Sequence, residues 1–354
     1  MLPLFKQSEN HFAGGSEFHS NGGEWRVEQQ RLHWPILDAF RDAAAQSGIA
    51  NINDFNTGDN EGCGYFQVNQ KAGVRWNAAK AFLKPIRQRP NLTVLTEVDV
   101  DRVVLENGRA AQVVGRQLGQ SLSWKARKEI VLCAGSVGSP GILQRSGIGP
   151  SNVLKPLGID VVRELPGVGG NLQDHLQLRL IYKLENARTL NQIAGSVWGK
   201  LGMGLQYLYD RSGPLSMAPS QLGAFARSGP EQTSANLEYH VQPLSLERFG
   251  EPLHAFPAFT ASVCDLRPQS RGRVDIRSAN PLQMLDRAAD ADRHIDPRRD
   301  PGATGTHLPV TAHKAVIHRH PRRTFGGTQC RRRPVEKRPI FNPVGSSVLF
   351  IEGI

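Results

Sequence analysis

The 354-residue sequence predicts a protein of mixed α/β and α+β class, in which an α/β part is followed by a part built on an antiparallel sheet. Three observations carry this prediction. An apolar run at residues 129–134 leads into a glycine turn and a short helix, as in an α/β crossover. An Asn-Gly pair at 107–108 separates two alternating segments, and strand-like alternation returns several times after residue 176.

The first part is expected to contain one helix and an antiparallel meander. Residues 32–47 predict the helix, because Pro35 stands near its start and apolar residues recur on one face. Residues 92–95 and 98–105 have the composition of strands. The Asn-Gly turn then predicts a return strand at 111–115.

The glycine-rich run from Gly135 to Gly149 is the most informative part of the chain. Gly135 opens a turn after the apolar strand, and Ser139 is expected to cap a helix that has Pro140 at its first position. Gly147 is a good residue to end that helix, since glycine adopts the left-handed conformation at low cost. A strand, a glycine turn and a short helix suit a backbone that passes close to a bulky cofactor.

The second part changes to strand-like alternation, at residues 177–182, 236–241 and 258–263. A helical segment at 197–210 lies between the first two of these strands. Residues 270–276 predict a tight turn into an edge strand. This alternation, with its turns, is typical of an antiparallel sheet.

The character of the sequence breaks after about residue 283. Residues 284–340 hold five of the eleven histidines, repeated Arg-Arg pairs and many prolines, without a helical or strand period. One interpretation is a disordered basic tail. We favour a shifted reading frame, because out-of-frame translation of a GC-rich gene yields Arg, Pro, Ala, Gly and His. The encoding DNA, read one base over, would then continue the earlier pattern.

The net charge of +11 is a local property of that tail. Residues 301–340 carry nine Lys and Arg against the single acid Glu336, a net +8, so the remaining chain is nearly balanced. No segment has the roughly 20 uninterrupted apolar residues of a transmembrane helix, and no signal peptide is evident. The cysteines are far apart and form no CxxC pair, which argues against zinc and disulfides and predicts a cytoplasmic location: Cys63, Cys133, Cys264 and Cys330.

The run from Gly135 to Gly149 resembles, position for position, the second signature of the glucose–methanol–choline (GMC) flavoprotein oxidoreductases. Residues 165–175 resemble the family's "PGVGxNLQDH" segment, and residues 60–66 and 75–83 resemble its stretch over the flavin. The resemblance extends over about residues 2–282. Several motifs in fixed order are far more specific than one glycine-rich loop.

The resemblance implies three regions. Residues 1–175 would be the remaining part of an FAD-binding, Rossmann-like domain, and 176–283 a substrate-binding domain with an antiparallel sheet. Residues 284–354 would be an aberrant basic tail. Relatives carry a G-x-G-x-x-G βαβ unit ahead of the position that matches Met1, so we expect an N-terminally truncated chain that retains FAD poorly.

The resemblance also assigns cofactor-binding residues. Val100 matches a strand residue whose backbone touches the adenine side of FAD, and Ala134 and Gly135 match the close-approach turn. Asn171 and Asp174 would lie toward the flavin side of the domain junction. The alternative for each is an ordinary strand or turn position.

No catalytic residue is predicted. Members of the family pass a hydride from an alcohol to N5 of FAD, and a histidine near the C-terminus accepts the hydroxyl proton. Residues 340–347 partly match that segment, with Asn342 in place of the histidine, although coincidence explains so short a match equally well. An amide does not titrate, so Asn342 cannot be a general base.

Other histidines and aromatic residues leave alternatives open. We interpret His175 as a structural position, and His240 either faces the substrate or is a hydrogen-bonded strand residue. The tail histidines do not have the spacing of a metal site: His313, His318 and His320. Three aromatic residues could provide faces for a quaternary ammonium or simply pack in the core: Trp198, Tyr207 and Tyr209.

We therefore expect a fragment of an FAD-dependent oxidoreductase that acts on CH–OH groups, of choline or another primary alcohol, with little or no activity of its own. No specific nucleic-acid partner is expected. The alternative is a non-enzymatic basic protein that binds nucleic acid or acidic surfaces through residues 301–340. A third possibility is an active enzyme completed by a separate chain that carries the ADP-binding unit. Flavin bound to the purified protein would distinguish the enzyme fragment from the non-enzymatic basic protein.

Overall fold

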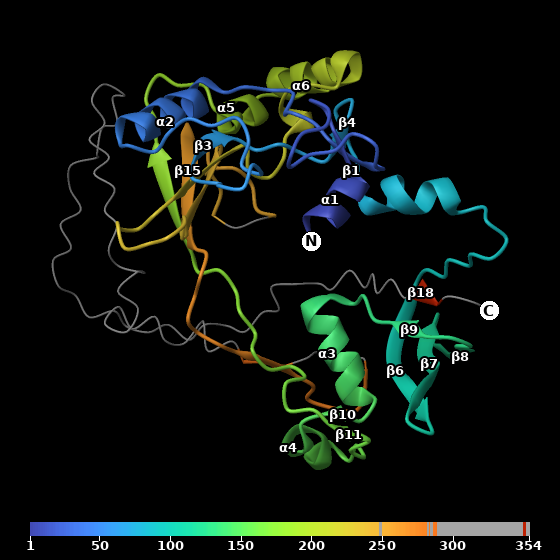
Figure 1. Ribbon diagram of the computed structural model, residues 1–354. Helices are drawn as coiled ribbons and strands as arrows, with labels where there is room; N and C mark the ends of the chain where they lie inside the picture. The colour runs from blue at the N-terminus through green and yellow to red at the C-terminus, as the bar shows by residue number, and fades with distance from the viewer. Residues whose placement is uncertain (248–249, 282, 284–285, 289–349, 352–354) are drawn as a thin grey trace. The chain divides into compact units, whose positions relative to one another are not determined.

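The structure, a computed structural model, divides into two compact units (Figure 1). Of the described residues, the first unit holds 1–86 and 175–268, and the second holds 87–174 and those after 268. Both units contain antiparallel sheets, so the mixed α and β class is confirmed. The domain boundaries expected at 175 and 283 stay a prediction. The structure describes residues 1–247, 250–281, 283, 286–288 and 350–351.

A five-stranded antiparallel sheet organises the first unit. Its spatial order is β12 (Gln177–Lys183), β15 (Ala258–Asp265), β14 (Leu237–Gln242), β13 (Leu222–Ala226) and β3 (Gly62–Tyr65). The three alternating segments predicted from the sequence are confirmed as β12, β14 and β15. β3 and β13 are short and glycine-containing, so their patterns gave no strand signal.

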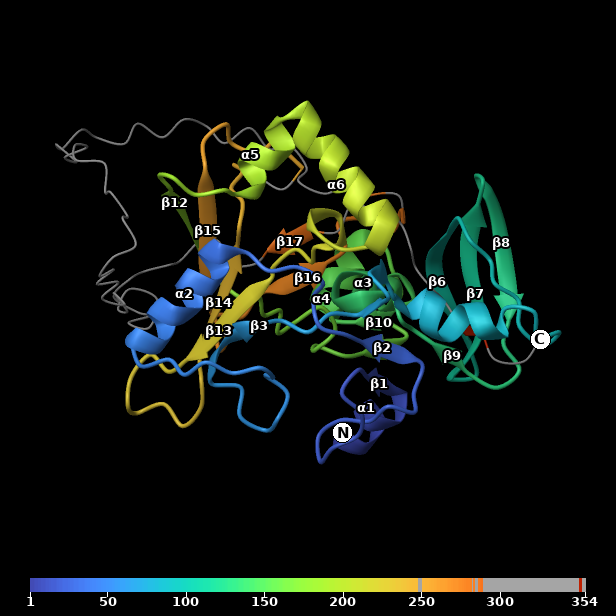
Figure 2. The same cartoon turned by 90° about the horizontal axis from the view of Figure 1, so that it is seen from above.

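Helix α2 (Pro35–Gln46) covers one face of this sheet (Figures 1 and 2). It begins at Pro35 with Trp34 as its N-cap, because a proline at the first position needs no N–H partner. Leu37 is fully buried in one cluster with Leu222 and Val241 of the sheet. The predicted helix is confirmed, starting three residues later than expected.

The other elements of the first unit are helix α6 and several short helices, turns and strands. β1 and β2 pair in parallel, β4 and β5 form a hairpin, and α6 confirms the helix predicted at residues 197–210. They are α1 (Leu2–Ser8), β1 (Glu9–His11), β2 (Trp25–Val27), β4 (Gln70–Lys71), β5 (Val74–Arg75), the π-helix η1 (Ala79–Leu83), the 3₁₀ turns η2 (Lys84–Ile86) and η4 (Pro214–Ser216), α5 (Leu190–Gly195) and α6 (Val197–Asp210).

A three-stranded meander forms the larger sheet of the second unit, in the order β6 (Val98–Glu106), β7 (Arg109–Gln117) and β8 (Gln120–Lys125). The predicted hairpin is confirmed: Asn107 and Gly108 both have positive φ, 53° and 78°, as a type I′ turn requires. The strand expected at 92–95 does not form. Within the described residues no strand pairs with this segment, and strand composition without a partner is insufficient.

The remaining elements of the second unit are helix α3, which contacts β6, β10 and β16, and several short helices and strands. They are β9 (Ile130–Val131), α3 (Gly135–Arg145), β10 (Ile148–Gly149), α4 (Ser151–Leu154), the 3₁₀ turn η3 (Lys155–Leu157), β11 (Arg163–Glu164), β16 (Arg273–Asp275), β17 (Asp286–Ala288) and β18 (Phe350–Ile351). β10 pairs in parallel with β11, and β16 and β9 pair antiparallel with β17 and β18. The edge strand predicted within 270–276 is confirmed as β16.

The predicted start of the glycine-run helix was wrong. α3 begins at Gly135, so Pro140 lies inside the helix and Ser139 is not its N-cap. The reason is the conformation of Gly135, whose φ of +75° turns the chain into the helix at once. The Ser139 hydroxyl instead accepts a hydrogen bond from the Ala134 N–H at 3.2 Å.

Candidate functional site

The glycine turn that precedes α3 is backed by an apolar cluster. Val100 on β6 is buried together with Val113 and Ile142, and Ala134 packs against the same cluster. Gly135 is exposed, and a Cβ added to it would meet no atom within 4 Å. The turn is therefore packed against the apolar cluster on one side and is exposed at Gly135 on the other.

The first turn of α3 is also open to a polar group. Its N-cap, Ala134, has no side chain that could bond to the helix amides. Uncapped amides at a helix N-terminus favour anionic or polar groups. This backbone and the open space at Gly135 fit the close approach of a large cofactor, which is the fit that FAD requires of the turn.

Asn171 lies outside that cluster. It is exposed and has a φ of +61°, a left-handed conformation that asparagine tolerates. The next residue, Leu172, exchanges two backbone hydrogen bonds with Gly272, at 2.9 and 2.7 Å. The structure thus brings Val100, Ala134 and Gly135 together and anchors Asn171 on a different segment of the same unit.

Gln144 of α3 connects these segments, and the sequence analysis missed it. Its buried amide nitrogen contacts the Asp275 carboxylate at 2.9 Å and two backbone carbonyls, those of Val168 and Val274, at 3.3 Å each. Its amide oxygen accepts from the Ile276 N–H at 2.9 Å. Gln144 therefore joins the family-like glycine run to β16 and to the loop that leads to Asn171.

The five-stranded sheet of the first unit has one apolar and one polar face. Along β14 the buried residues Leu237, Tyr239 and Val241 alternate with half-buried Glu238, His240 and Gln242. The strand register places a single row across the polar face: Gly64, Gly223, His240, Ser262 and Arg179. Within this row His240 and Arg179 are half-buried, whereas Gly64, Gly223 and Ser262 are buried, so a polar ligand could contact the face only at those two side chains.

His240 lies at the centre of that row. Its Nε2 lies 3.3 Å from a carboxylate oxygen of Glu238 on the same strand, and the ring of Phe66 lies 5.9 Å away. A Cβ on Gly223 would lie 2.0 Å from the Phe66 ring, so only glycine leaves room for that ring. Phe55 extends the aromatic cluster, 5.3 Å from Phe66 and 5.1 Å from Phe225. His240 thus lies close to a carboxylate of its own strand and is also located on the polar face.

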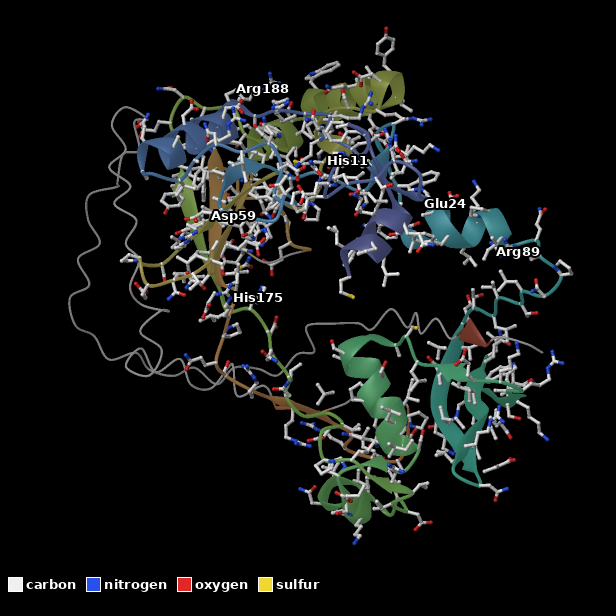
Figure 3. The ribbon with its side chains drawn as sticks, viewed as in Figure 1. His11, Glu24, Asp59, Arg89, His175 and Arg188 are labelled. Atoms are coloured by element: carbon white, nitrogen blue, oxygen red, sulfur yellow. The ribbon has the colours of Figure 1, made fainter. Side chains whose placement is uncertain are left out.

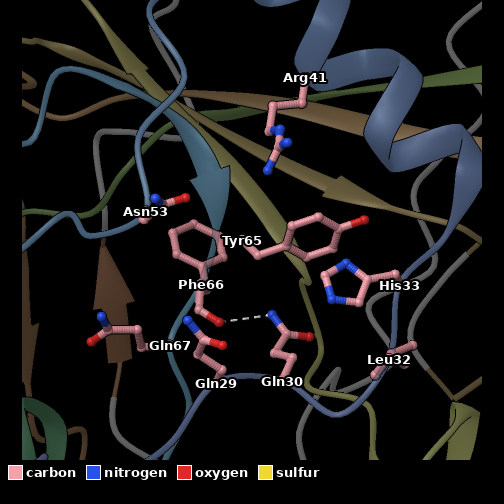
Figure 4. Close-up of a pocket in the computed structure, with 9 residues that line it drawn as sticks. All are labelled: Gln29, Gln30, Leu32, His33, Arg41, Asn53, Tyr65, Phe66 and Gln67. Carbon is pink, nitrogen blue, oxygen red and sulfur yellow. Dashed lines mark hydrogen bonds between the residues drawn. The ribbon is translucent and has the colours of Figure 1, made fainter. Parts of the chain in front are cut away.

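A small cavity lies beside β3 (Figure 4). It holds about 90 Å³ and is lined by polar side chains, among them Arg41, Gln30 and His33. The Nε of Arg41 and the Oε1 of Gln30 are buried without a hydrogen-bond partner in the part of the chain that the structure describes. Ligand pockets usually hold about 300–1,000 Å³. The cavity therefore suits a few waters or a small anion and is too small for a flavin.

A buried histidine is held between two carboxylates near the N-terminus, and the sequence analysis missed it as well. His19 Nδ1 lies 3.0 Å from Glu9, and its Nε2 lies 2.9 Å from Asp54. Burial alone lowers the pKa of His19, but hydrogen bonding to Glu9 and the charges of Glu9 and Asp54 together raise it. His11, labelled in Figure 3, stacks on His19 at 4.0 Å.

These residues have the composition of a metal site. Ligand atoms of His11, His19 and Asp54 lie within 4.8 Å of one another. Both nitrogens of His19 already face carboxylates, and a raised pKa favours its protonated form, which does not ligate metals. The geometry is therefore that of an ion network that connects β1 to the loop after α2.

Several predicted features fall outside the described residues. They are Asn342, the histidines His313, His318 and His320, the basic segment 301–340 and the proposed change of reading frame. The aromatic residues of α6 are described, and core packing was the wrong interpretation for Trp198 and Tyr209, which are 80% and 93% exposed. Tyr207 is half-buried and donates to the Gly73 carbonyl at 3.3 Å.

Comparison with known proteins identifies relatives over most of the chain. The family model described as GMC oxidoreductase matches residues 1–177. The alcohol dehydrogenase [acceptor] of Pseudomonas putida is 36% identical over 283 residues, which cover 79% of this chain and 51% of that protein. An oxygen-dependent choline dehydrogenase of Ectopseudomonas mendocina is 34% identical over 287 residues, 80% of this chain and 50% of that protein.

Solved structures agree with the sequence relatives. Pyridoxine 4-oxidase from Mesorbium loti has a TM-score of 0.71 at 27% identity, over 85% of this chain and 56% of that one. Formate oxidase from Aspergillus oryzae RIB40 has the same fold, with a TM-score of 0.71 at 21% identity over 80% of this chain and 56% of that one. The chain spans about half the length of the curated relatives that it matches. By its sequence and its fold, the chain belongs to the GMC oxidoreductase family.

Proposed function

We propose that this chain supplies the flavin-facing turn and the substrate-facing sheet of an FAD-dependent oxidoreductase that acts on CH–OH groups, of choline or another primary alcohol. GMC oxidoreductases are FAD-dependent flavoproteins. One observation carries the proposal: the open glycine turn at Gly135, backed by Val100 and Ala134, occurs in a chain of this family. The second unit would then be a partial Rossmann-like domain.

Each residue of the proposed cofactor site has a physical role. Gly135 leaves its backbone uncovered, and the packing of Val100 and Ala134 holds that backbone in place. Asn171, on the segment that Gln144 anchors, would contribute a polar side chain. When bound, FAD supplies the hydride acceptor for the alcohol carbon.

The polar face of the five-stranded sheet supports the substrate side of the proposal. His240 and Glu238 offer polar contacts that could orient a hydroxyl group, and Phe66 and Phe225 border them. A carboxylate beside aromatic rings also suits a cationic alcohol such as choline. Two curated relatives are named as an alcohol dehydrogenase and a choline dehydrogenase, and both names fit this chemistry.

The test is FAD binding by the purified chain, measured by flavin fluorescence. We expect weak, saturable binding that Gly135→Val lowers at least tenfold. The matched control is Gly158→Val, because Gly158 has a similar φ of +70° and equally open surroundings. Both substitutions therefore impose similar backbone strain, and only one touches the turn. Absence of saturable binding, or equal loss in both variants, would contradict the proposal.

We further propose that the chain alone has little or no turnover. The sequence contains no G-x-G-x-x-G. If residues 340–347 are the family's C-terminal segment, Asn342 would stand in place of its histidine, where an amide cannot accept a proton. Alcohol-dependent reduction of an artificial acceptor by the FAD-loaded chain is therefore expected to stay at background. Turnover comparable with that of an intact alcohol dehydrogenase would refute this part.

A further inference from the structure

Helix α6 presents a continuous apolar surface to solvent. Six large side chains on it are between 51% and 93% exposed: Val197, Trp198, Leu201, Leu205, Leu208 and Tyr209. At 3.6 residues per turn these six positions fall within an arc of about 120°. Scattered exposed leucines are ordinary on proteins, but a contiguous helical stripe of this kind marks an interaction surface.

The contacts on the opposite side of α6 fix this orientation. A Cβ on Gly199 would lie 2.1 Å from the Ile193 carbonyl oxygen, so that side of the helix touches the preceding backbone. The Tyr207 hydroxyl donates to the Gly73 carbonyl at 3.3 Å. Arg31 donates to the Asp210 carbonyl at 2.8 Å. The apolar stripe therefore faces outward because the other side of the helix is occupied.

The surroundings of the stripe are basic. Lys200 lies on the helix, Arg211 caps its C-terminus, and Arg31 binds a backbone carbonyl there. The β4–β5 hairpin, whose Gly73 touches Arg211 and Tyr207, adds Lys71 and Arg75. The Asp210 carboxylate at the end of the helix interacts with the charge of Arg31. Within the described part of the chain, none of the five cations forms a salt bridge with a carboxylate at 4 Å or less.

We propose that α6 docks on a membrane surface that contains anionic lipids. A helix with leucines flanked by Trp and Tyr on one side, and basic residues around them, has the composition of an interfacial helix. Its 14 residues suit a helix that lies in the membrane plane. Across the described residues, no helix is long and apolar enough to cross a bilayer.

The experiment is vesicle flotation of the full chain. Vesicles of phosphatidylcholine with about one third phosphatidylglycerol are compared with pure phosphatidylcholine, at low and high salt. We expect stronger binding to the anionic vesicles, and at least a tenfold loss of affinity in the double variant Leu201→Gln, Leu205→Gln. The matched control is Leu178→Gln, Leu180→Gln on β12, whose leucines are also exposed, at 56% and 42%.

A second readout separates α6 from the basic segment 301–340, whose net charge of +8 also attracts anionic lipids. Insertion of Trp198 should shift its emission to shorter wavelength and allow quenching by brominated lipid acyl chains. Trp198→Phe removes that signal, while the other four tryptophans remain. Electrostatic attraction of segment 301–340 alone would bring the protein to the vesicles without a shift in Trp198 emission.

Three results would overturn the proposal. If the Leu201/Leu205 variant floats like wild type, the apolar stripe is not the membrane-binding surface. The absence of a Trp198-dependent spectral change on anionic vesicles would lead to the same conclusion. A wild-type dimer in solution that this variant converts to a monomer would assign the stripe to a second copy of the chain. Circular dichroism checks that each variant keeps its helix content.

Discussion

Gln144 shows how one buried side chain can hold the candidate cofactor region together. Its amide is fully buried and bonded at both ends, to groups on β16 and on the loop at Val168. Replacing it with leucine leaves the Asp275 carboxylate with one fewer donor and the Ile276 N–H without its acceptor. We expect Gln144→Leu to lower the free energy of unfolding by about 2–3 kcal/mol.

Urea unfolding measures this loss. Gln120→Leu on the exposed β8 is the control, because that glutamine is exposed on the last strand of the meander. Similar stabilities for the two variants would show that the Gln144 bonds contribute little.

The Glu9–His19–Asp54 network predicts a pH dependence of stability. Because the pKa of His19 is raised in the folded chain, the network stabilises the fold fully below the ordinary histidine pKa. That contribution is lost as the pH rises through the raised value. His19→Gln should therefore cost about 2 kcal/mol near pH 6 and markedly less near pH 9.

The measurement is urea unfolding of wild type and His19→Gln across that pH range. Glu9→Gln should remove much of the same stability, so the double variant should lose less than the sum of the two single losses. Glu17→Gln, which alters an exposed carboxylate outside the network, is the control. A stability difference that does not change with pH would rule out an imidazolium at this position.

Some residues of the candidate sites could be identified from the sequence and others could not. Ala134 and Gly135 were assigned because they lie at the start of a motif with fixed local order, and Val100 because its strand resembles one of the family. Their contact with FAD stays a prediction. Gln144 and His19 were missed because their partners are far away in the chain: Gln144 bonds to Asp275, and His19 to Asp54. No local pattern encodes a pair of this kind.

At the scale of elements, local signals succeeded where local chemistry decides the structure. Pro35 set the start of α2, and Asn107-Gly108 set the β6–β7 turn. The prediction of a strand at 92–95 was wrong because a strand needs a hydrogen-bonding partner. The helix expected to start at Ser139 begins earlier because Gly135 adopts a positive φ. Partners and backbone conformation depend on the rest of the fold.

Helix α2 should be far more sensitive than α6 to loss of a leucine. Leu37 is fully buried between α2 and the sheet, whereas Leu205 on α6 is 58% exposed. Leu37→Ala removes buried surface and leaves a cavity, so we expect a loss of about 2–5 kcal/mol. Leu205→Ala should change stability by less than about 0.5 kcal/mol. Thermal unfolding followed by circular dichroism tests the contrast, and a large loss in Leu205→Ala would mean that α6 is covered.

For the whole molecule, the sequence predicted the class and most strands of the main sheet but not their order. β3 at residues 62–65 pairs with β13 at residues 222–226. The sheet therefore gains its fifth strand only when segments far apart in the sequence meet. A pairing between short glycine-containing strands so far apart has no signature in a single sequence. The family motifs predicted what the chain is related to, and the fold agrees.

The two units have separate apolar cores, which predicts that their stabilities add. The cluster around Leu37 and the cluster around Val113 share no residue. Val113→Ala should cost about 1–3 kcal/mol. The double variant of Leu37→Ala and Val113→Ala should then match the sum of the single losses within about 0.5 kcal/mol.

A double-mutant cycle by urea unfolding checks this additivity, with tryptophan fluorescence as the probe. Trp34 packs in the Leu37 cluster, and Trp124 packs against the Val113 cluster, so each core has its own reporter. If the units unfold separately, each substitution shifts one reporter and leaves the other in place. If either single substitution shifts both reporters together, the two cores unfold as one body, since coincident probes mark a single transition. A coupling larger than about 1 kcal/mol would mean that the two sites share partners and that the cores are not independent.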